Sequence, residues 1–334
     1  IAEFVMDDEL PVLRTVVGPS EYVYDYATPR ISTLPKHTAY VKIGEGCSRP
    51  CAFCIIPQLR GRARSRSIDS IVKEASRLTA SGTLEINLIA QDLTAYGIDR
   101  GDDTTLEKLL RELVKIDGLR WIRLMYNYPL NVSDGLIKLI ATSDKICKYL
   151  DMPLQHIDDD VLKRMRRHVT EAETRSLIAK LRSSIPNVTL RTTLLVGFPG
   201  ETEQQFEKLL DFVKETRFER LGVFAFSIED GAAAAQMPDQ VPPEVKEERK
   251  HRIMVEQQKI STEKNAALVG KEVEVLIDRA FHRSDDHSYI GRTEGHAIDI
   301  DGNVYVKGRN LPVGTIVRTK ITKNAEYDLF ASAV

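Results

Sequence analysis

The stretch Tyr40–Pro57 reads YVKIGEGCSRPCAFCIIP, and it joins a short apolar run to a tight group of three cysteines. The group is Cys47, Cys51 and Cys54, so its spacing is Cys-x3-Cys-x2-Cys. Three thiolates on one loop can hold three irons of a cubane cluster and leave the fourth iron open for chemistry. A structural zinc site instead needs four ligands, usually from paired Cys-x2-Cys half-sites. Only the distant Cys147 or a histidine could complete one, so the spacing favours an iron–sulfur centre.

Composition describes an ordinary folded protein. The chain has 334 residues, of which 42% are hydrophobic and 29% charged, which excludes global disorder. With 47 basic and 49 acidic residues the net charge is −2, so bulk charge gives no attraction to nucleic acid. No run approaches the roughly 20 apolar residues of a membrane span. The acidic start IAEFVMDDEL does not resemble a secretory signal. We expect a cytoplasmic protein, without a membrane partner, whose natural start lies upstream of Ile1.

Between Thr38 and Ser227, apolar runs alternate with amphipathic helical patterns. The runs are mostly continuously apolar, as in a parallel sheet covered on both faces. Six such units in a row predict an α/β fold, a partial six-stranded parallel barrel with function at the carboxyl ends of its strands. Capping-box pairs at Thr104/Glu107 and Thr202/Gln205 predict the starts of two helices. The expected strands are Ala39–Ile43, Leu84–Ala90, Trp121–Tyr126, Lys148–Met152, Val188–Val196 and Arg220–Phe226.

The pattern changes after residue 237. Pro238, Pro242 and Pro243 interrupt it, and a charged helix is predicted over Glu244–Leu268. Beyond Gly270, short alternating runs separated by Asp/Gly turns predict a small all-β barrel. We therefore expect a core domain over residues 32–265 and a β-barrel over residues 266–334. The expected barrel strands are Glu272–Ile277, His287–Ile290, Val304–Val306 and Ile316–Ile321.

The three cysteines, with Phe53 before the last, resemble the signature of the radical S-adenosylmethionine (SAM) superfamily. In that superfamily the open iron binds SAM, and one electron from the cluster cleaves it to an adenosyl radical that abstracts hydrogen from carbon. The resemblance implies two cofactors, a [4Fe-4S] cluster with one open iron site and SAM. It also implies an external one-electron donor, and it places Phe53 beside the cofactors.

Longer motifs are similar to those of the methylthiotransferase branch, and the closing barrel is similar to its TRAM domain. Enzymes of this branch carry a second [4Fe-4S] cluster on three cysteines of a preceding domain. Residues 1–31 resemble the linker from such a domain, and Cys147 alone cannot replace its cysteines. The motifs are Cys54–Ser67, Ile89–Gly97, Met152–His156, Leu162–Arg167 and Arg191–Thr202.

Polar residues end several expected strands. Gln91 and Asp92 follow the second strand, where a barrel does its chemistry, and they are candidates for catalysis or for capping the next segment. Arg191 lies within the fifth strand, where a buried charge needs a partner. That partner is either the carboxylate of the cofactor, which makes Arg191 a candidate for binding or catalysis, or a structural ion pair. Gln155 and His156 end the fourth strand, and functional and structural roles are equally open for them.

The stretch Gly197–Glu201 follows the fifth strand. By resemblance, the backbone at Val196 and Gly197 lines the adenine or ribose pocket of SAM, with Gln91 nearby. The alternative is a tight turn with no further role. A dinucleotide fold is not supported, because Gly44 and Gly46 are followed by Arg49 where that motif needs a third glycine.

Charge and motif together bear on the substrate. Residues 268–334 hold nine Lys/Arg against ten Asp/Glu, a net charge of −1, and the hairpin around Asp299 and Asp301 is acidic. Such a surface suits a basic protein better than RNA. The third strand ends in Tyr126–Pro129, YNYP, where tRNA-modifying relatives usually carry His-Pro. Two basic groups are expected to form solvated faces or an RNA contact. They are Arg60, Arg62, Arg64 and Arg66, and Lys163, Arg164, Arg166 and Arg167.

Within the methylthiotransferase branch that the chain resembles, these features favour the type of enzyme that acts on the β-carbon of an aspartate in the twelfth small-subunit ribosomal protein. Its basic substrate is expected to bind through the C-terminal barrel. The alternative is methylthiolation of an adenosine next to the tRNA anticodon. A third interpretation is a non-catalytic, metal-containing RNA-binding module.

Overall fold

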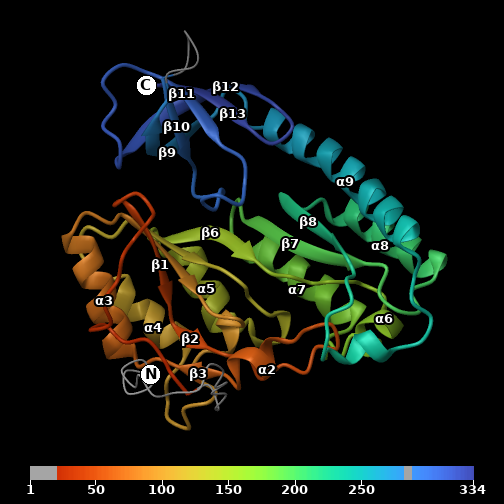
Figure 1. Ribbon diagram of the computed structural model, residues 1–334. Coiled ribbons are helices and arrows are strands. Elements are labelled where there is room, and N and C mark those ends of the chain that lie inside the picture. Colours follow the sequence, from red (N-terminus) through yellow and green to blue (C-terminus); the bar gives the residue numbers. More distant parts are fainter. Residues whose placement is uncertain (1–20, 282–287) are drawn as a thin grey trace, which may run out of the picture.

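The computed structural model describes residues 21–281 and 288–334, which form a sheet-and-helix core and a small barrel (Figure 1). The core contains one sheet of six parallel strands in the order β1-β4-β5-β6-β7-β8, with β1 and β8 at its edges. The expected α/β class and partial barrel are confirmed, and all six strands lie within two residues of their predicted ends. They are β1 (Thr38–Lys42), β4 (Glu85–Ile89), β5 (Trp121–Leu124), β6 (Ile146–Asp151), β7 (Thr189–Val196) and β8 (Arg220–Ala225).

The two faces of the sheet differ in chemistry. In β4, Ile86 and Leu88 belong to the main apolar core. Glu85 and Asn87 alternate with them and are also buried, with 0% and 1% exposure. The inner face of the sheet is therefore buried yet polar, whereas the sequence pattern had suggested two apolar faces.

Helices line the outer side of the sheet (Figure 1). The helix α8 begins after Thr202, which forms the predicted capping box with Gln205. The cap predicted at Thr104 is wrong, because α4 is capped by Thr105, whose hydroxyl accepts from Lys108 N–H. The two threonines are adjacent, and the local pattern does not separate them. The α-helices of the described residues are α2 (Ile56–Arg60), α3 (Ile68–Ala80), α4 (Leu106–Leu113), α5 (Asp134–Thr142), α6 (Asp159–Arg164), α7 (Glu171–Ser184), α8 (Glu203–Thr216) and α9 (Pro243–Ala266).

The long helix α9 packs against β8 and α8 and leads to the C-terminal barrel (Figure 1). This barrel is closed, with strand order β10-β11-β13-β12-β9. The sequence had predicted four strands and missed the fifth, β13, which pairs in parallel with β11 and antiparallel with β12. His287, predicted to begin a strand, lies outside the described residues, as do residues 1–20 of the expected linker. The strands are β9 (Glu272–Ala280), β10 (Tyr289–Arg292), β11 (Val304–Lys307), β12 (Ile316–Asn324) and β13 (Leu329–Ala333).

A buried charge network joins the two domains at the amino ends of the core strands. Glu85 pairs with Arg123 of β5 at 3.0 Å and with Arg292 of the barrel at 2.8 Å. Arg292 also pairs with Asp278 of β9 at 2.8 Å. Burial alone would raise the pKa of Glu85, but Arg292 and Arg123 outweigh it and hold the pKa at about 2.

Residues 293–303 of the barrel, here called the plug loop, reach into the inner face of the sheet. Arg123 Nη1 donates to the carbonyl of Glu294 at 2.6 Å, and Tyr149 donates its hydroxyl proton to Asp301 at 2.8 Å. Ala297 packs among the buried residues Tyr149 and Met125. The plug loop therefore closes the end of the core barrel opposite the cysteines.

The plug loop overturns part of the expected recognition surface. The Asp301 side chain is only 4% exposed and accepts hydrogen bonds from Tyr149 and from Ala297 N–H. It therefore cannot present its charge to a partner. Asp299 is exposed, with φ of 58°. No helix among the described residues is long and apolar enough to cross a membrane.

Candidate functional site

The three cysteines lie on the loop between β2 (Gly44–Glu45) and α2 (Ile56–Arg60), beyond the carboxyl end of β1. Gly46 begins this loop with φ of +77°, and a Cβ there would lie 2.3 Å from the carbonyl oxygen of Arg62. Only glycine fits that approach. The Cys47 N–H donates to Gly61 O at 3.1 Å, which ties the start of the loop to its return.

The chemistry of the loop fits an iron–sulfur cluster. None of the three thiols is in a disulfide; Cys47 is buried, and Cys51 and Cys54 are partly exposed. Burial raises the pKa of Cys47 and of Cys54, and the nearby charge of Cys51 raises the pKa of both further. Within residues 21–281 and 288–334, no group of three or more His, Cys, Asp or Glu side chains is arranged to hold a single metal ion.

The middle of the cysteine loop is held by its neighbours. Ala52 N–H donates to Met165 O at 3.0 Å, and Ala52 O accepts from Ala234 N–H at 2.8 Å. Ala52 also packs against Phe198 and Phe226, whose rings meet edge to face. Three segments distant in sequence therefore fix the positions of Cys51 and Cys54.

Gln91 and Asp92 lie at the same end of the sheet and already have protein partners. The Gln91 amide donates to Glu45 Oε1 at 3.0 Å, while its own buried oxygen accepts no hydrogen bond from any described residue. Asp92 pairs with Arg49 at 2.8 Å and caps a short 3-10 turn through Ala95 N–H. The capping role expected for Asp92 is thus present. Neither residue's part in binding or catalysis is tested by these contacts.

Val196 ends β7, and Gly197 turns the chain away with φ of +70°. Glu201 holds this turn, because its carboxylate accepts from Gly197 N–H at 2.5 Å and from Phe198 N–H at 3.1 Å. Arg249 of α9 pairs with Glu201 at 3.4 Å. The sequence suggested a tight turn here but not its dependence on α9.

His156 is buried beside the same turn, 4.0 Å from Glu201. Its Nδ1 accepts from Asp158 N–H at 3.0 Å, and its Nε2 has no hydrogen-bond partner in the part of the chain that the structure covers. Gln155 has φ of 72° and makes an isolated bridge to Leu194. Gln155 therefore pairs with β7 and His156 lies against the turn that follows β7, while a functional role stays a prediction for both.

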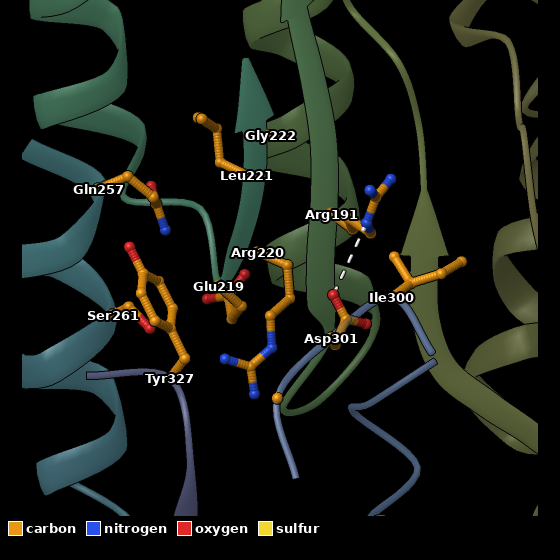
Figure 2. Close-up of a pocket in the computed structure, with 11 residues that line it drawn as sticks. Arg191, Glu219, Arg220, Leu221, Gly222, Gln257, Ser261, Ile300, Asp301 and Tyr327 are labelled. Carbon is orange, nitrogen blue, oxygen red and sulfur yellow. Dashed lines mark ion pairs between the residues drawn. The ribbon is translucent and has the colours of Figure 1, made fainter. Parts of the chain in front are cut away.

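Arg191 lies away from the cysteines, near the amino end of β7. It pairs with Asp151 at 2.6 Å and lies 3.7 Å from Asp301 (Figure 2). Arg191 lines a cavity of about 360 Å³ between β8, α9 and the plug loop. The structural ion pair considered for Arg191 is therefore present, and a role toward the cofactor stays a prediction.

The basic groups divide between surface and interior. Arg60, Arg62 and Arg166 are exposed, as a solvated face requires. Arg66 is buried and pairs with Glu74 at 2.6 Å. Arg167 is also buried, and its guanidinium lies 3.9 Å from the Cys51 sulfur. Sequence reasoning missed Arg167 as a site residue, because its charge run was typical of a surface.

Comparisons with known proteins place this site in a family. A profile of the radical SAM superfamily matches residues 41–213, and a TRAM domain profile matches residues 269–334. A protein of Geotalea uraniireducens named ribosomal protein uS12 methylthiotransferase RimO is 50% identical over 335 residues, 100% of this chain and 75% of the relative. The chain belongs to the uS12 methylthiotransferase family.

Further uS12 methylthiotransferases agree, among them one from Syntrophotalea carbinolica that is 51% identical over 96% of this chain and 70% of its own length. The solved radical SAM methyltransferase TsrM from Kitasatospora setae aligns with a TM-score of 0.51 and 19% identity, over 62% of this chain and 41% of that one. That likeness shows a shared fold. Membership of the radical SAM superfamily confirms the two expected cofactors, a [4Fe-4S] cluster and SAM.

Proposed function

We propose that this protein replaces a hydrogen on the β-carbon of an aspartate in ribosomal protein uS12 with a methylthio group, working in the cytoplasm. The names of its relatives, at about half identity over nearly the whole chain, support this substrate. The observation that carries the reaction type is one loop with three free thiols beyond the carboxyl ends of parallel strands. Active sites of parallel barrels lie at that end.

We assign the cluster to Cys47, Cys51 and Cys54. When bound there, it supplies one electron from an external donor for the cleavage of SAM to an adenosyl radical. The chain's own residues position that chemistry. Gly46 and the Ala52 hydrogen bonds shape the cysteine loop, and Phe53 lies between two of the ligands.

The turn at Val196 and Gly197 is proposed to line the SAM pocket, with Gln91 near it. Support comes from Phe198, which packs directly on the cysteine loop, and from the buried, unpartnered oxygen of Gln91. Asp92 is proposed to act as a positioning residue through Arg49. A second cluster, predicted for a preceding domain, would hold the sulfur to be transferred.

The C-terminal barrel is proposed to bind the basic substrate, with domain boundaries near residues 32, 265 and 334. The TRAM profile over residues 269–334 supports the division. The net charge of −1 over residues 268–334 supports a protein partner. Of the two acidic residues expected to recognise it, only Asp299 has an exposed side chain.

The test is mass spectrometry of uS12 and of tRNA after reaction with the natural full-length enzyme, SAM and a one-electron donor. We expect a methylthio mass gain on one aspartate of uS12 and none on tRNA. A methylthio mass gain on a tRNA adenosine would overturn the assignment of uS12 as the substrate. SAM left uncleaved by enzyme with a full iron and sulfide content would overturn the reaction type.

A further inference from the structure

A buried cation, the guanidinium of Arg167, lies beside the cysteine loop. Arg167 is 7% exposed, and its Nη1 lies 3.9 Å from the Cys51 sulfur. Its Nη2 donates to Pro153 O at 2.5 Å, and its Nε makes no hydrogen bond within residues 21–281 and 288–334. In the part of the chain that the structure describes, no carboxylate lies within ion-pair distance of it. A buried guanidinium without a counter-charge is costly, so its position calls for an anion at the cysteines.

An aromatic ring holds this cation in place. The guanidinium carbon of Arg167 lies 4.2 Å from the ring centroid of Tyr128, and that of Arg49 lies 4.0 Å from the same centroid. Stacking on an aromatic face is a favourable site for a guanidinium. The ring itself is buried, with 5% exposure. Tyr128 thus gathers two cations from distant segments at one point.

The stack is tied to the cysteine loop from both sides. Arg49 N–H donates to the Cys47 sulfur at 3.4 Å, and Arg49 Nε donates to Asp92 at 2.8 Å. The Thr94 hydroxyl donates a hydrogen bond to Asp92 Oδ1 at 2.9 Å and accepts one from Tyr128 N–H at 2.9 Å. Asp92 therefore fixes one cation and, through Thr94, the ring between them. It also neutralises Arg49, which leaves Arg167 as the uncompensated charge.

We propose that Arg167, held by stacking on Tyr128, raises the reduction potential of the cluster. Reduction transfers one electron from a low-potential one-electron donor to the cluster, whose net charge becomes one unit more negative. A fixed positive charge in a buried site stabilises that reduced state more than the oxidised one. The inference rests on the proposed cluster at the three cysteines.

The experiment is a redox titration of the reconstituted 334-residue chain, in which Cys47, Cys51 and Cys54 form the single trio of neighbouring cysteines, so that one cluster is titrated. The titration is followed by the electron paramagnetic resonance signal of the reduced cluster. In Arg167→Gln we expect at least a tenfold lower ratio of reduced to oxidised cluster at a fixed potential, about 59 mV for one electron. Arg166→Gln is the matched control, since it removes an exposed charge one residue away. An unchanged potential in Arg167→Gln, or an equal shift in Arg166→Gln, would overturn the proposal.

The ring provides an independent pair of variants in case Arg167→Gln assembles no cluster. Tyr128→Phe keeps the aromatic face and should leave the potential in place, whereas Tyr128→Leu removes the face and should lower it. Equal potentials in the two would also reject the proposal. Iron and sulfide content and the cluster's absorption are measured in every variant. A normal cluster with an unmoved potential therefore rejects only the role of Arg167, while a parent protein that binds no cluster rejects the cysteine site itself.

Discussion

At the scale of single residues, the four cysteines occupy two distinct environments. Cys47, Cys51 and Cys54 share one loop, whereas Cys147 is buried between the core and the barrel, next to Ala297. Burial raises the pKa of Cys147 to about 12. Its neighbours are the apolar side chains of another hydrophobic cluster, so Cys147 packs as a small core residue.

Substituting the cysteines one at a time should therefore separate the two environments. Cys51→Ala should abolish both the brown chromophore after reconstitution and the reductive cleavage of SAM. Cys147→Ala should keep both and lose roughly 1 kcal/mol of stability, as for a small core substitution. Iron and sulfide analysis per chain, together with product chromatography, measures the outcome. Full cleavage activity in Cys51→Ala would contradict the ligand assignment.

Residue roles were predictable where the signal is local. The cysteine spacing lies within eight residues, so the sequence alone indicated a shared site. Asp301 was misread because its partner Tyr149 is 152 positions away, and charge in a hairpin does not reveal burial. Arg167 was missed for the same reason, since its ring and its cysteine come from other segments.

At the scale of elements, the core strands were the easiest to predict, because each is a compact apolar run between helical patterns. The barrel strand β13 was missed because LFASA is short, lies at the end of the chain and has three small residues. Its strand character depends on pairing with β11 and β12, which are distant in sequence. Tertiary pairing, not local propensity, sets such a strand.

The helix α9 supports the site from outside the residues that the radical SAM profile matches. Arg249→Ala should leave the buried Glu201 without its cation. Because Glu201 holds the turn at Gly197, that turn should become less rigid. The cysteine loop should follow, since Phe198 packs against it. We expect amide hydrogen exchange at least about tenfold faster over residues 51–54 and 197–201, and weaker SAM binding. Mass spectrometry of exchanged peptides measures the first and equilibrium dialysis the second.

The same helix offers a control in Arg252, which pairs with Glu203 and Glu207 at the surface. Arg252→Ala should leave exchange in both segments unchanged. Arg249→Lys should recover part of the protection, because one ammonium can pair with Glu201 or Glu203 but does not reproduce the guanidinium fork. Parent-like exchange in Arg249→Ala would show that Glu201 alone holds the turn.

At the scale of the whole molecule, the network around Glu85 links the domains and makes stability depend on pH. The folded pKa of Glu85, about 2, is below its ordinary value of 4.5, so the unfolded chain binds the proton more readily. Its contribution is therefore complete above pH 4.5 and is lost as the pH falls toward 2. The free energy of unfolding should decline over that range.

Glu85→Gln should flatten this decline and cost about 3–5 kcal/mol at neutral pH, because it breaks a buried ion pair. Chemical denaturation at several pH values measures both effects. Glu274→Gln is the control, since its pair with Arg120 also joins barrel to core but is exposed at the surface. It should cost less than about 1 kcal/mol. Equal losses in the two variants would refute the role of burial.

The plug loop has a consequence for protein engineering. A C-terminal domain that makes few contacts with the core can be exchanged between relatives as a unit, and the substrate preference can be exchanged with it. Here the graft would carry residues 293–303 into a space shaped by Arg123, Tyr149 and Arg191 of the host. A chimera joined only at the end of α9 would therefore place the plug loop of one relative against the core side chains of another, which need not fit it. A workable chimera must also take the residues at those three core positions from the protein that supplies the barrel.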